Sequence, residues 1–132
     1  MTTRETIDRF IDARGKGLEA AIAALLTDDV VWRPPPSAGI GPFNGRAEVA
    51  TALAGGAAGR NLDTSTIKRD VRKVIVDGDT AVVLQRMSAT TLGGADYAND
   101  YCWVCVCDGA GLIAEIDEYV DTLHAARVFG WV

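Results

Sequence analysis

Histidine is almost absent from the sequence, and so are the motifs of metal and nucleophile chemistry. The single histidine, His124, has no second histidine or paired cysteines in the spacing of a metal site. No serine or cysteine stands in a recognisable nucleophile motif. We therefore expect neither a metal nor a cofactor, and a packing or surface role for His124.

Basic residues are scarce, and no long apolar run is present. The 13 lysines and arginines are outnumbered by 18 acidic residues, and the net charge of −5 comes without the clustered basic surface that nucleic acid requires. The longest apolar stretch near the N-terminus, AAIAALL at 20–26, is too short to span a bilayer. The first ten residues lack the layout of a signal peptide. We expect a cytoplasmic protein that binds neither nucleic acid nor membranes.

Cysteine is limited to three residues of one apparent strand, Cys102, Cys105 and Cys107. Neighbours this close in an extended strand alternate faces or lie too far apart for good disulfide geometry. We expect buried, reduced thiols.

The sequence has the length and composition of one folded domain, 1–132. Apolar residues make up 48% and charged residues 23%, close to the globular average. Thr2 with Glu5 predicts the start of a first helix, and a second helical pattern spans 18–26. A short helix is expected from Arg46, after a loop rich in proline and glycine.

The strands come after these helices, apart from a short β-prone run at Val30–Trp32. Asp-Gly turns separate two pairs of the later strands. We predict these strands at 64–76, 80–91, 97–107 and 112–121. Helices followed by an antiparallel meander indicate an α+β fold, with the helices packed on one face of a curved sheet.

One acidic residue of the last strand is set apart by alternation. In the row Leu112, Ala114, Ile116, Glu118 and Val120, Glu118 is the only charged group. If that row faces the interior, desolvation raises the pKa of Glu118 and makes it a candidate general base or acid. The alternative is a glutamate at the end of a strand that reaches solvent.

A buried Glu118 needs a partner, and Arg86 on the strand 80–91 is a candidate. Arg86 shares a row with Ser88, whereas Gln85 and Met87 lie in the opposite row. The periodicity does not decide which row is inside. An inward Arg86 would pair with Glu118, and an outward Arg86 would be an ordinary solvated arginine.

The strand 97–107 carries a large aromatic row with polar tips. Tyr97, Asn99, Tyr101 and Trp103 alternate with smaller residues on the other face. Such a row suits a ligand pocket, because the rings supply apolar surface while hydroxyl, indole and amide groups orient a ligand. The alternative is that the rings fill the core or form a dimer face.

The chain resembles the SnoaL-like group of the nuclear transport factor 2-like superfamily. The resemblance rests on LLTDDVVW before the proline-rich loop, GPFNGRAEV opening a helix, and DGAGLIAEIDEYVD closing the sheet. It implies a cone-shaped curved antiparallel sheet with N-terminal helices on its concave side, enclosing a pocket. It also implies a homodimer joined through the outer sheet face.

Within that superfamily, the resemblance to limonene epoxide hydrolases is incomplete. Of their water-activating residues Arg86 is kept, while Trp32, Pro34, Ser88 and Glu118 replace a Tyr, an Asn and two Asp residues. The losses argue against epoxide hydrolysis.

The ketosteroid isomerase pattern matches less well. Pro34 stands at the position of its base, and Trp103 stands at the position of its oxyanion-stabilising acid. The polyketide cyclases are similar in placing one acid on the last strand, where Glu118 stands.

We therefore predict a cofactor-independent enzyme of the cyclase or isomerase type, acting on a small, apolar, oxygenated molecule. Glu118 would transfer a proton, and Arg86 would orient Glu118 or stabilise an enolate. The predicted substrate-binding residues are Trp32, Ser88, Asn99, Tyr101, Trp103 and Ile116.

The alternative function is a non-catalytic domain that binds a small molecule or serves dimerisation. Both ligand hypotheses predict a cavity of roughly a few hundred Å³ around Glu118. A cone filled by contact between Trp32 and Trp103 would indicate a structural module instead.

Overall fold

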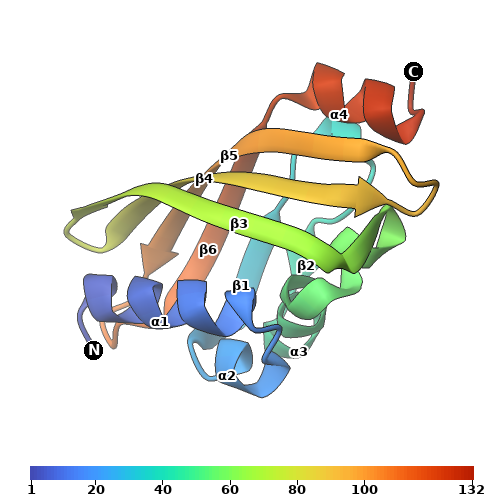
Figure 1. Ribbon diagram of the computed structural model, residues 1–132. Coiled ribbons are helices and arrows are strands. Elements are labelled where there is room, and N and C mark those ends of the chain that lie inside the picture. Colours follow the sequence, from blue (N-terminus) through green and yellow to red (C-terminus); the bar gives the residue numbers. More distant parts are fainter.

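The computed structural model describes all 132 residues, which are arranged on one six-stranded sheet (Figure 1). The sheet has the strand order β2-β1-β6-β5-β4-β3. In chain order the elements are α1 (Thr3–Gly15), α2 (Glu19–Ala23), β1 (Leu26–Arg33), β2 (Phe43–Asn44), α3 (Arg46–Thr51), β3 (Leu62–Asp77), β4 (Thr80–Thr91), β5 (Asp96–Cys107), β6 (Ile113–Val120) and α4 (Thr122–Phe129).

The N-terminal helices lie across the concave side of the sheet (Figure 1). Helix α1 begins with a capping box, in which the Thr2 hydroxyl accepts from the Glu5 amide and the Glu5 carboxylate accepts from the Thr2 amide. Its buried stripe includes Ile7 and Phe10, and α2 adds Ile22. No helix is long and apolar enough to cross a membrane.

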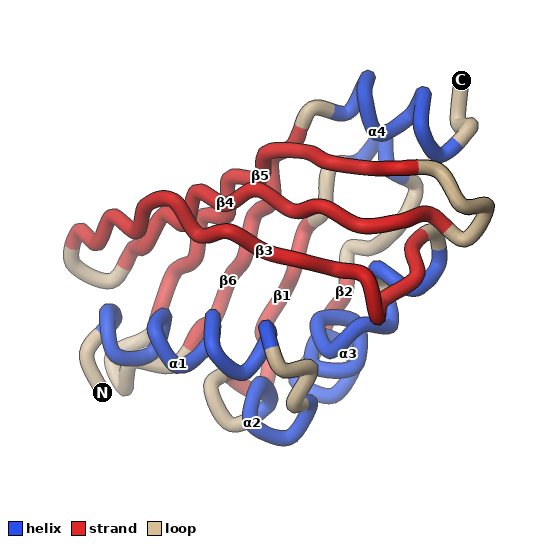
Figure 2. Tube along the Cα trace, viewed as in Figure 1, coloured by secondary structure: helices blue, strands red, loops and turns tan.

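The sheet is strongly curved and does not close (Figure 2). Strands β3 to β6 form the predicted antiparallel meander. This arrangement confirms the predicted α+β fold class with N-terminal helices on the concave side. One pair adds to that prediction, because β1 lies beside β6 in parallel orientation.

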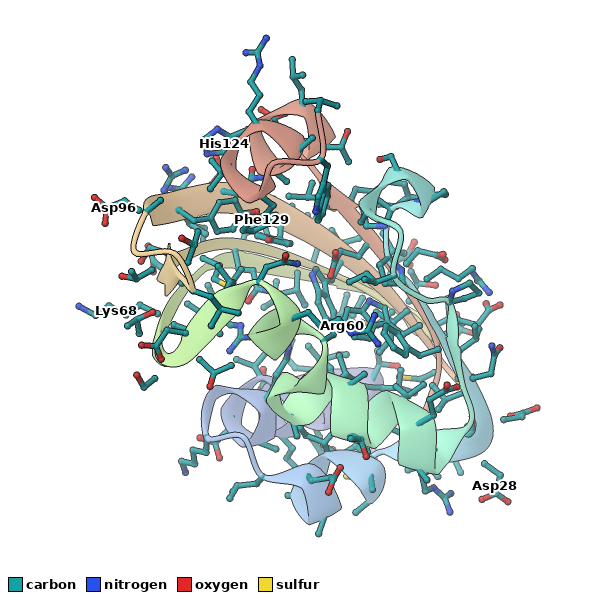
Figure 3. All side chains as sticks on the ribbon, turned by 90° about the vertical axis from the view of Figure 1, so that its right-hand side faces the viewer. Asp28, Arg60, Lys68, Asp96, His124 and Phe129 are labelled. Atoms are coloured by element: carbon teal, nitrogen blue, oxygen red, sulfur yellow. The ribbon has the colours of Figure 1, made fainter.

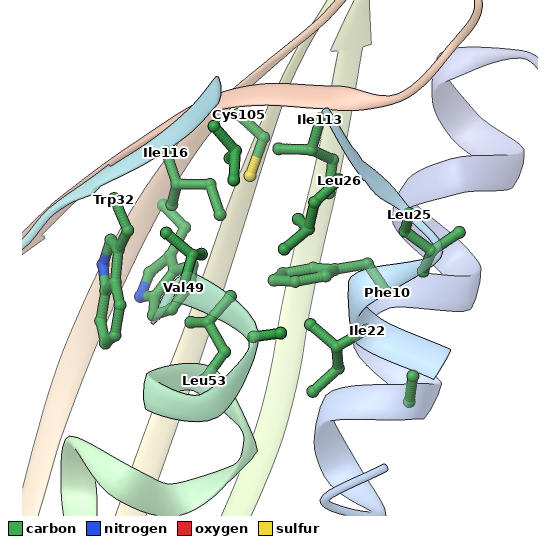
Figure 4. Packing of buried hydrophobic residues seen from close by; sticks show 14 of the residues in the cluster. Phe10, Ile22, Leu25, Leu26, Trp32, Val49, Leu53, Cys105, Ile113 and Ile116 are labelled. Carbon is green, nitrogen blue, oxygen red and sulfur yellow. The ribbon is translucent and has the colours of Figure 1, made fainter. Parts of the chain in front are cut away.

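The buried hydrophobic side chains of the core form two clusters. The larger cluster combines Phe10 and Ile22 with Trp32 and Ile116 from the sheet (Figure 4). A smaller cluster near α4 comprises Leu62, Met87, Ala89, Tyr97 and Ala125. Side chains of both clusters line an apolar pocket on this side of the sheet.

Helix α4 forms one end of the molecule and carries His124 and Phe129 (Figure 3). It begins where the Asp121 carboxylate accepts from the His124 amide, at 3.1 Å, and ends at Gly130 in the left-handed conformation. The exposed His124 ring stacks on Tyr97 with 5.8 Å between ring centroids. His124 therefore packs at the surface.

The three cysteines are free. Cys105 and Cys107 are buried on the inner sheet face, and burial raises the pKa of the Cys105 thiol to about 12. Cys102 is half-buried on the opposite face.

Candidate functional site

Glu118 lies on the concave side of β6, in the row that alternation predicted. Ile116 in the same row is fully buried, and Glu118 and Val120 line the pocket. The acidic residues of the opposite row face outward, where Arg33 binds Asp117 at 2.7 Å and Glu115 at 3.2 Å. The acidic cluster of β6 is thus divided between an outer ion-pair network and one inner carboxylate.

The Glu118 carboxylate is desolvated without being neutralised by a close partner. No hydrogen bond and no ion pair within 4.0 Å joins it to the protein, so its oxygens are free to contact a ligand. Burial raises the pKa of Glu118 to about 7, and the nearby positive charges of Arg14 and Arg69 offset part of that rise. Near neutral pH the group can therefore both accept and donate a proton.

Arg86 and Ser88 do not lie in this site, which corrects the expectation for both residues. The inner row of β4 is the one that contains Gln85 and Met87, so alternation places Arg86 and Ser88 on the outer face. There Arg86 binds the Asp100 carboxylate at 3.1 Å. Arg86 cannot orient Glu118, and Ser88 cannot contact a ligand in the pocket.

Two other arginines flank Glu118, and sequence analysis did not single them out. Arg14, in the last turn of α1, stacks its guanidinium over the Trp103 ring at 3.8 Å from the centroid. Arg69 reaches the pocket from β3. Burial lowers the pKa of both guanidinium groups, and for Arg14 the lowered value of about 9 is still above neutral pH.

A signal for Arg14 was present in the sequence. Arg14 follows Phe10 by one helical turn and shares the buried stripe of α1. Arg69 was harder to place, because β3 has an irregular register between Val71 and Lys73 that breaks the alternation of the strand.

A polar chain on β5 positions Tyr101. The Asn99 side-chain amide donates to the Tyr97 hydroxyl at 3.1 Å and to the Asp121 carbonyl at 3.0 Å. The Tyr97 and Tyr101 hydroxyls are 2.7 Å apart. Both tyrosines line the pocket, whereas Asn99 is buried behind them. Burial raises the pKa of Tyr101, so its hydroxyl stays protonated and can donate a hydrogen bond.

Three residues that were predicted to contact a substrate, Trp32, Trp103 and Ile116, belong to the core and differ in their access to the pocket. Trp32 lines the pocket, and its buried indole N–H has no hydrogen-bond partner. Trp103 lies beside Trp32, with 5.4 Å between ring centroids, and lines a second cavity. Ile116 is fully buried beneath them. The structure thus brings Trp32, Tyr101 and Glu118 together at one pocket.

The pocket is smaller than expected, with a volume of about 90 Å³ against the roughly 300–1,000 Å³ of common ligand sites. Contact between Trp32 and Trp103 fills the adjoining part of the cone but not the space beside Glu118. Apolar side chains form most of the lining, and the C-terminal residues Phe129 and Trp131 contribute to it. The site is therefore suited to a small ligand.

Comparison with known proteins identifies this architecture. The sequence profile of the SnoaL-like domain matches residues 7–116. No curated protein sequence matches the chain.

Several solved structures share the fold. An NTF2-like protein of unknown function from Burkholderia pseudomallei has a TM-score of 0.81 and 19% identity, over 98% of each chain. TerC, co-crystallised with polyporic acid, has a TM-score of 0.83 and 20% identity, over 97% of this chain and 98% of its own. A hypothetical protein with a ketosteroid isomerase-like fold from Catenulispora acidiphila, in complex with trimethylamine, has a TM-score of 0.76 and 14% identity, over 96% of this chain and 92% of its own.

Proposed function

Because the chain belongs to the SnoaL-like domain family, whose fold hosts cyclases and isomerases, we propose that it is a cytoplasmic, cofactor-independent enzyme of that type. Its substrate would be a small, largely apolar compound with a carbonyl group. The observation that carries this proposal is the Glu118 carboxylate, which lines an apolar pocket with a pKa of about 7 and has no hydrogen-bond partner. A base with that pKa suits proton transfer at neutral pH.

In the proposed reaction, ionised Glu118 removes a proton from the carbon next to the substrate carbonyl. The electron pair of the broken C–H bond forms the C=C bond of an enolate, and the carbonyl oxygen takes the negative charge. The Tyr101 hydroxyl, held by Tyr97 and Asn99, donates a hydrogen bond to that oxygen.

The proton on Glu118 then has two possible destinations. In an isomerisation it returns to another carbon of the same conjugated system. In a cyclisation the enolate carbon attacks a second carbonyl carbon, and the oxygen of that carbonyl takes the proton. Neither outcome consumes an oxidant or a reductant.

Two of the similar structures were solved with a small organic molecule, which supports a ligand-binding role for this chain. TerC was co-crystallised with polyporic acid, and the Catenulispora acidiphila protein is in complex with trimethylamine. By analogy of fold, we propose that this chain also binds a small organic molecule on its concave side.

Hydrogen–deuterium exchange tests the proton transfer without knowledge of the natural substrate. Phenylacetone, a small aryl ketone with an acidic CH₂ group, is incubated with the protein in D₂O, and loss of the CH₂ signal is followed by proton NMR. We expect the protein to accelerate the exchange and Glu118→Gln to reduce that acceleration by about 10²–10⁴-fold. Arg86→Gln, on the outer face, serves as the control.

Equal acceleration by the Glu118→Gln variant would contradict the assigned base. The second candidate is a domain that binds a small metabolite without converting it, and the small volume of the pocket is compatible with it. In that case Glu118→Gln alters ligand affinity, and neither protein accelerates exchange.

We also propose that the chain forms a homodimer through the outer face of its sheet. No helix covers that face, which presents the outward side chains Val82, Leu84, Val104 and Val106. Tyr119 on the same face is 61% exposed. An uncovered apolar sheet face is typical of an association surface.

A further inference from the structure

Two guanidinium groups at the pocket lack the partners that other arginines of the chain have. Arg33, Arg46, Arg72 and Arg86 each form an ion pair with a carboxylate. The charges of Arg14 and Arg69 are at least as strongly desolvated as those of these four arginines. Neither Arg14 nor Arg69, however, makes an ion pair or a side-chain hydrogen bond. The Nε atom of Arg14 is buried without any hydrogen-bond acceptor. Buried charged donors normally have acceptors, so a partner is missing from this site.

The charge of the pocket is opposite in sign to that of the protein. Of the residues that line it, Arg14, Arg69 and Glu118 are the charged ones, which leaves one positive charge uncompensated even when Glu118 is ionised. The whole chain carries a net charge of −5. Because the rest of the lining is mainly apolar, an excess charge there acts on a ligand more strongly than it would in water.

The two arginines also mark a definite place for an anion. They line both the pocket beside Glu118 and a second cavity of about 100 Å³, so they stand at the boundary between the two spaces. Arg14 is held by its stacking on Trp103, and β3 positions the backbone of Arg69 at the pocket. Two neighbouring guanidinium groups can bind the two oxygens of a carboxylate.

We infer that the ligand of this pocket is an anion, an apolar carboxylic acid whose carboxylate is bound by Arg14 and Arg69. This inference rests on the proposed function, in that it assumes that the pocket receives a ligand. With the carboxylate at the arginines, Tyr101 and Glu118 remain free to act on a carbonyl group of the same molecule. The substrate class is then an apolar oxo acid rather than a neutral ketone.

Three probes of one shape and different charge test this inference. Benzoate, benzamide and benzamidinium carry charges of −1, 0 and +1 on the same small ring, and calorimetric titration at low salt measures their affinities. We expect benzoate to bind roughly 10–100-fold more tightly than benzamide, the range for hydrogen bonds to charged groups. Benzamidinium should bind most weakly, because the arginines repel it.

Substitution of Arg69 tests whether this residue causes the preference for benzoate over benzamide. Arg69→Gln should bring the ratio of benzoate to benzamide affinity close to one, and Arg69→Lys should keep part of the preference. Lys68→Gln is the matched control, since Lys68 directly precedes Arg69 in β3, does not line the pocket and points out of the molecule (Figure 3). Thermal unfolding of each variant checks that the fold is retained.

The possible failures are distinguishable. Equal affinities for benzoate and benzamide, or tighter binding of benzamidinium, would overturn the anion preference and leave the ligand pocket standing. An unchanged preference in Arg69→Gln would overturn the assigned residues. If none of the three probes bound, both the anion preference and the proposed ligand pocket would be rejected.

Discussion

At the scale of single residues, the site depends on a carboxylate whose protonated form is favoured by folding. Glu118 pairs with no other group in the protein, and the cost of desolvating its charge exceeds the attraction of Arg14 and Arg69. A charged group in this setting lowers the free energy of unfolding. The desolvation of ionised Glu118 therefore destabilises the fold. A ligand or a reaction that stabilises this charge, or removes it by protonation, recovers that free energy.

This cost predicts how stability depends on pH. The folded protein holds a proton on Glu118 up to about pH 7, whereas the unfolded chain releases it near 4.5, so the free energy of unfolding falls as pH rises through that window. Glu118→Gln lacks this contribution. We expect the variant to be more stable than the wild type by about 1–3 kcal/mol at pH 8, and equal to it below pH 4.5.

Urea denaturation at pH 4, 6 and 8 measures the difference. The control is Glu19→Gln, on the exposed start of α2, whose stability should follow that of the wild type at each pH. A difference that did not change with pH would show that the carboxylate is well solvated, and a wild type that gained stability on Glu118 ionisation would show that the carboxylate is paired.

At the scale of elements, the alternation of side chains predicted which face of β6 points inward but not which face of β4 does. In β6 the inner row contained one charged residue among apolar ones, so Glu118 was identified from the pattern alone. In β4 the periodicity left the inner row undecided, and Arg86 was expected in the site from the resemblance to the epoxide hydrolases, whereas the pairing with β3 and β5 places it on the outer face. Local patterns do not report such long-range pairing.

The remaining parts of the site depend on contacts between distant segments. The parallel pair of β1 and β6 brings Trp32 beside Ile116, although the two residues belong to opposite ends of the chain. Arg14 and Arg69 meet only because α1 packs on the concave side of the sheet. The fold class was predictable from the order of helices and strands, but the charges around Glu118 were not.

At the scale of the whole molecule, curvature separates the two sheet faces by role. The concave face holds the core and the pocket, and the convex face leaves apolar side chains without cover. Tyr119 of β6 and Ile75 of β3, at 61% and 45% exposure, are large side chains that lie open on this convex face. Closure of this face by a second copy would bury them without obstructing the pocket.

Light scattering coupled to gel filtration tests the dimer. The wild type should elute with twice the mass of one chain, and Val104→Glu, which places a charge in the middle of the outer face, should elute as a monomer. Glu19→Gln, on the exposed start of α2 and away from the outer face, is the control. A wild-type protein of monomeric mass at all concentrations would contradict the proposed interface.

Glu118, as a pocket carboxylate that transfers protons near neutral pH, must itself titrate in that range. Carbon-13 NMR of the glutamate side-chain carboxyl groups, assigned by comparison with Glu118→Gln, measures its titration directly. The structure predicts a midpoint near pH 7 for Glu118, because burial outweighs the attraction of Arg14 and Arg69. A midpoint near the ordinary value of 4.5 would contradict the account.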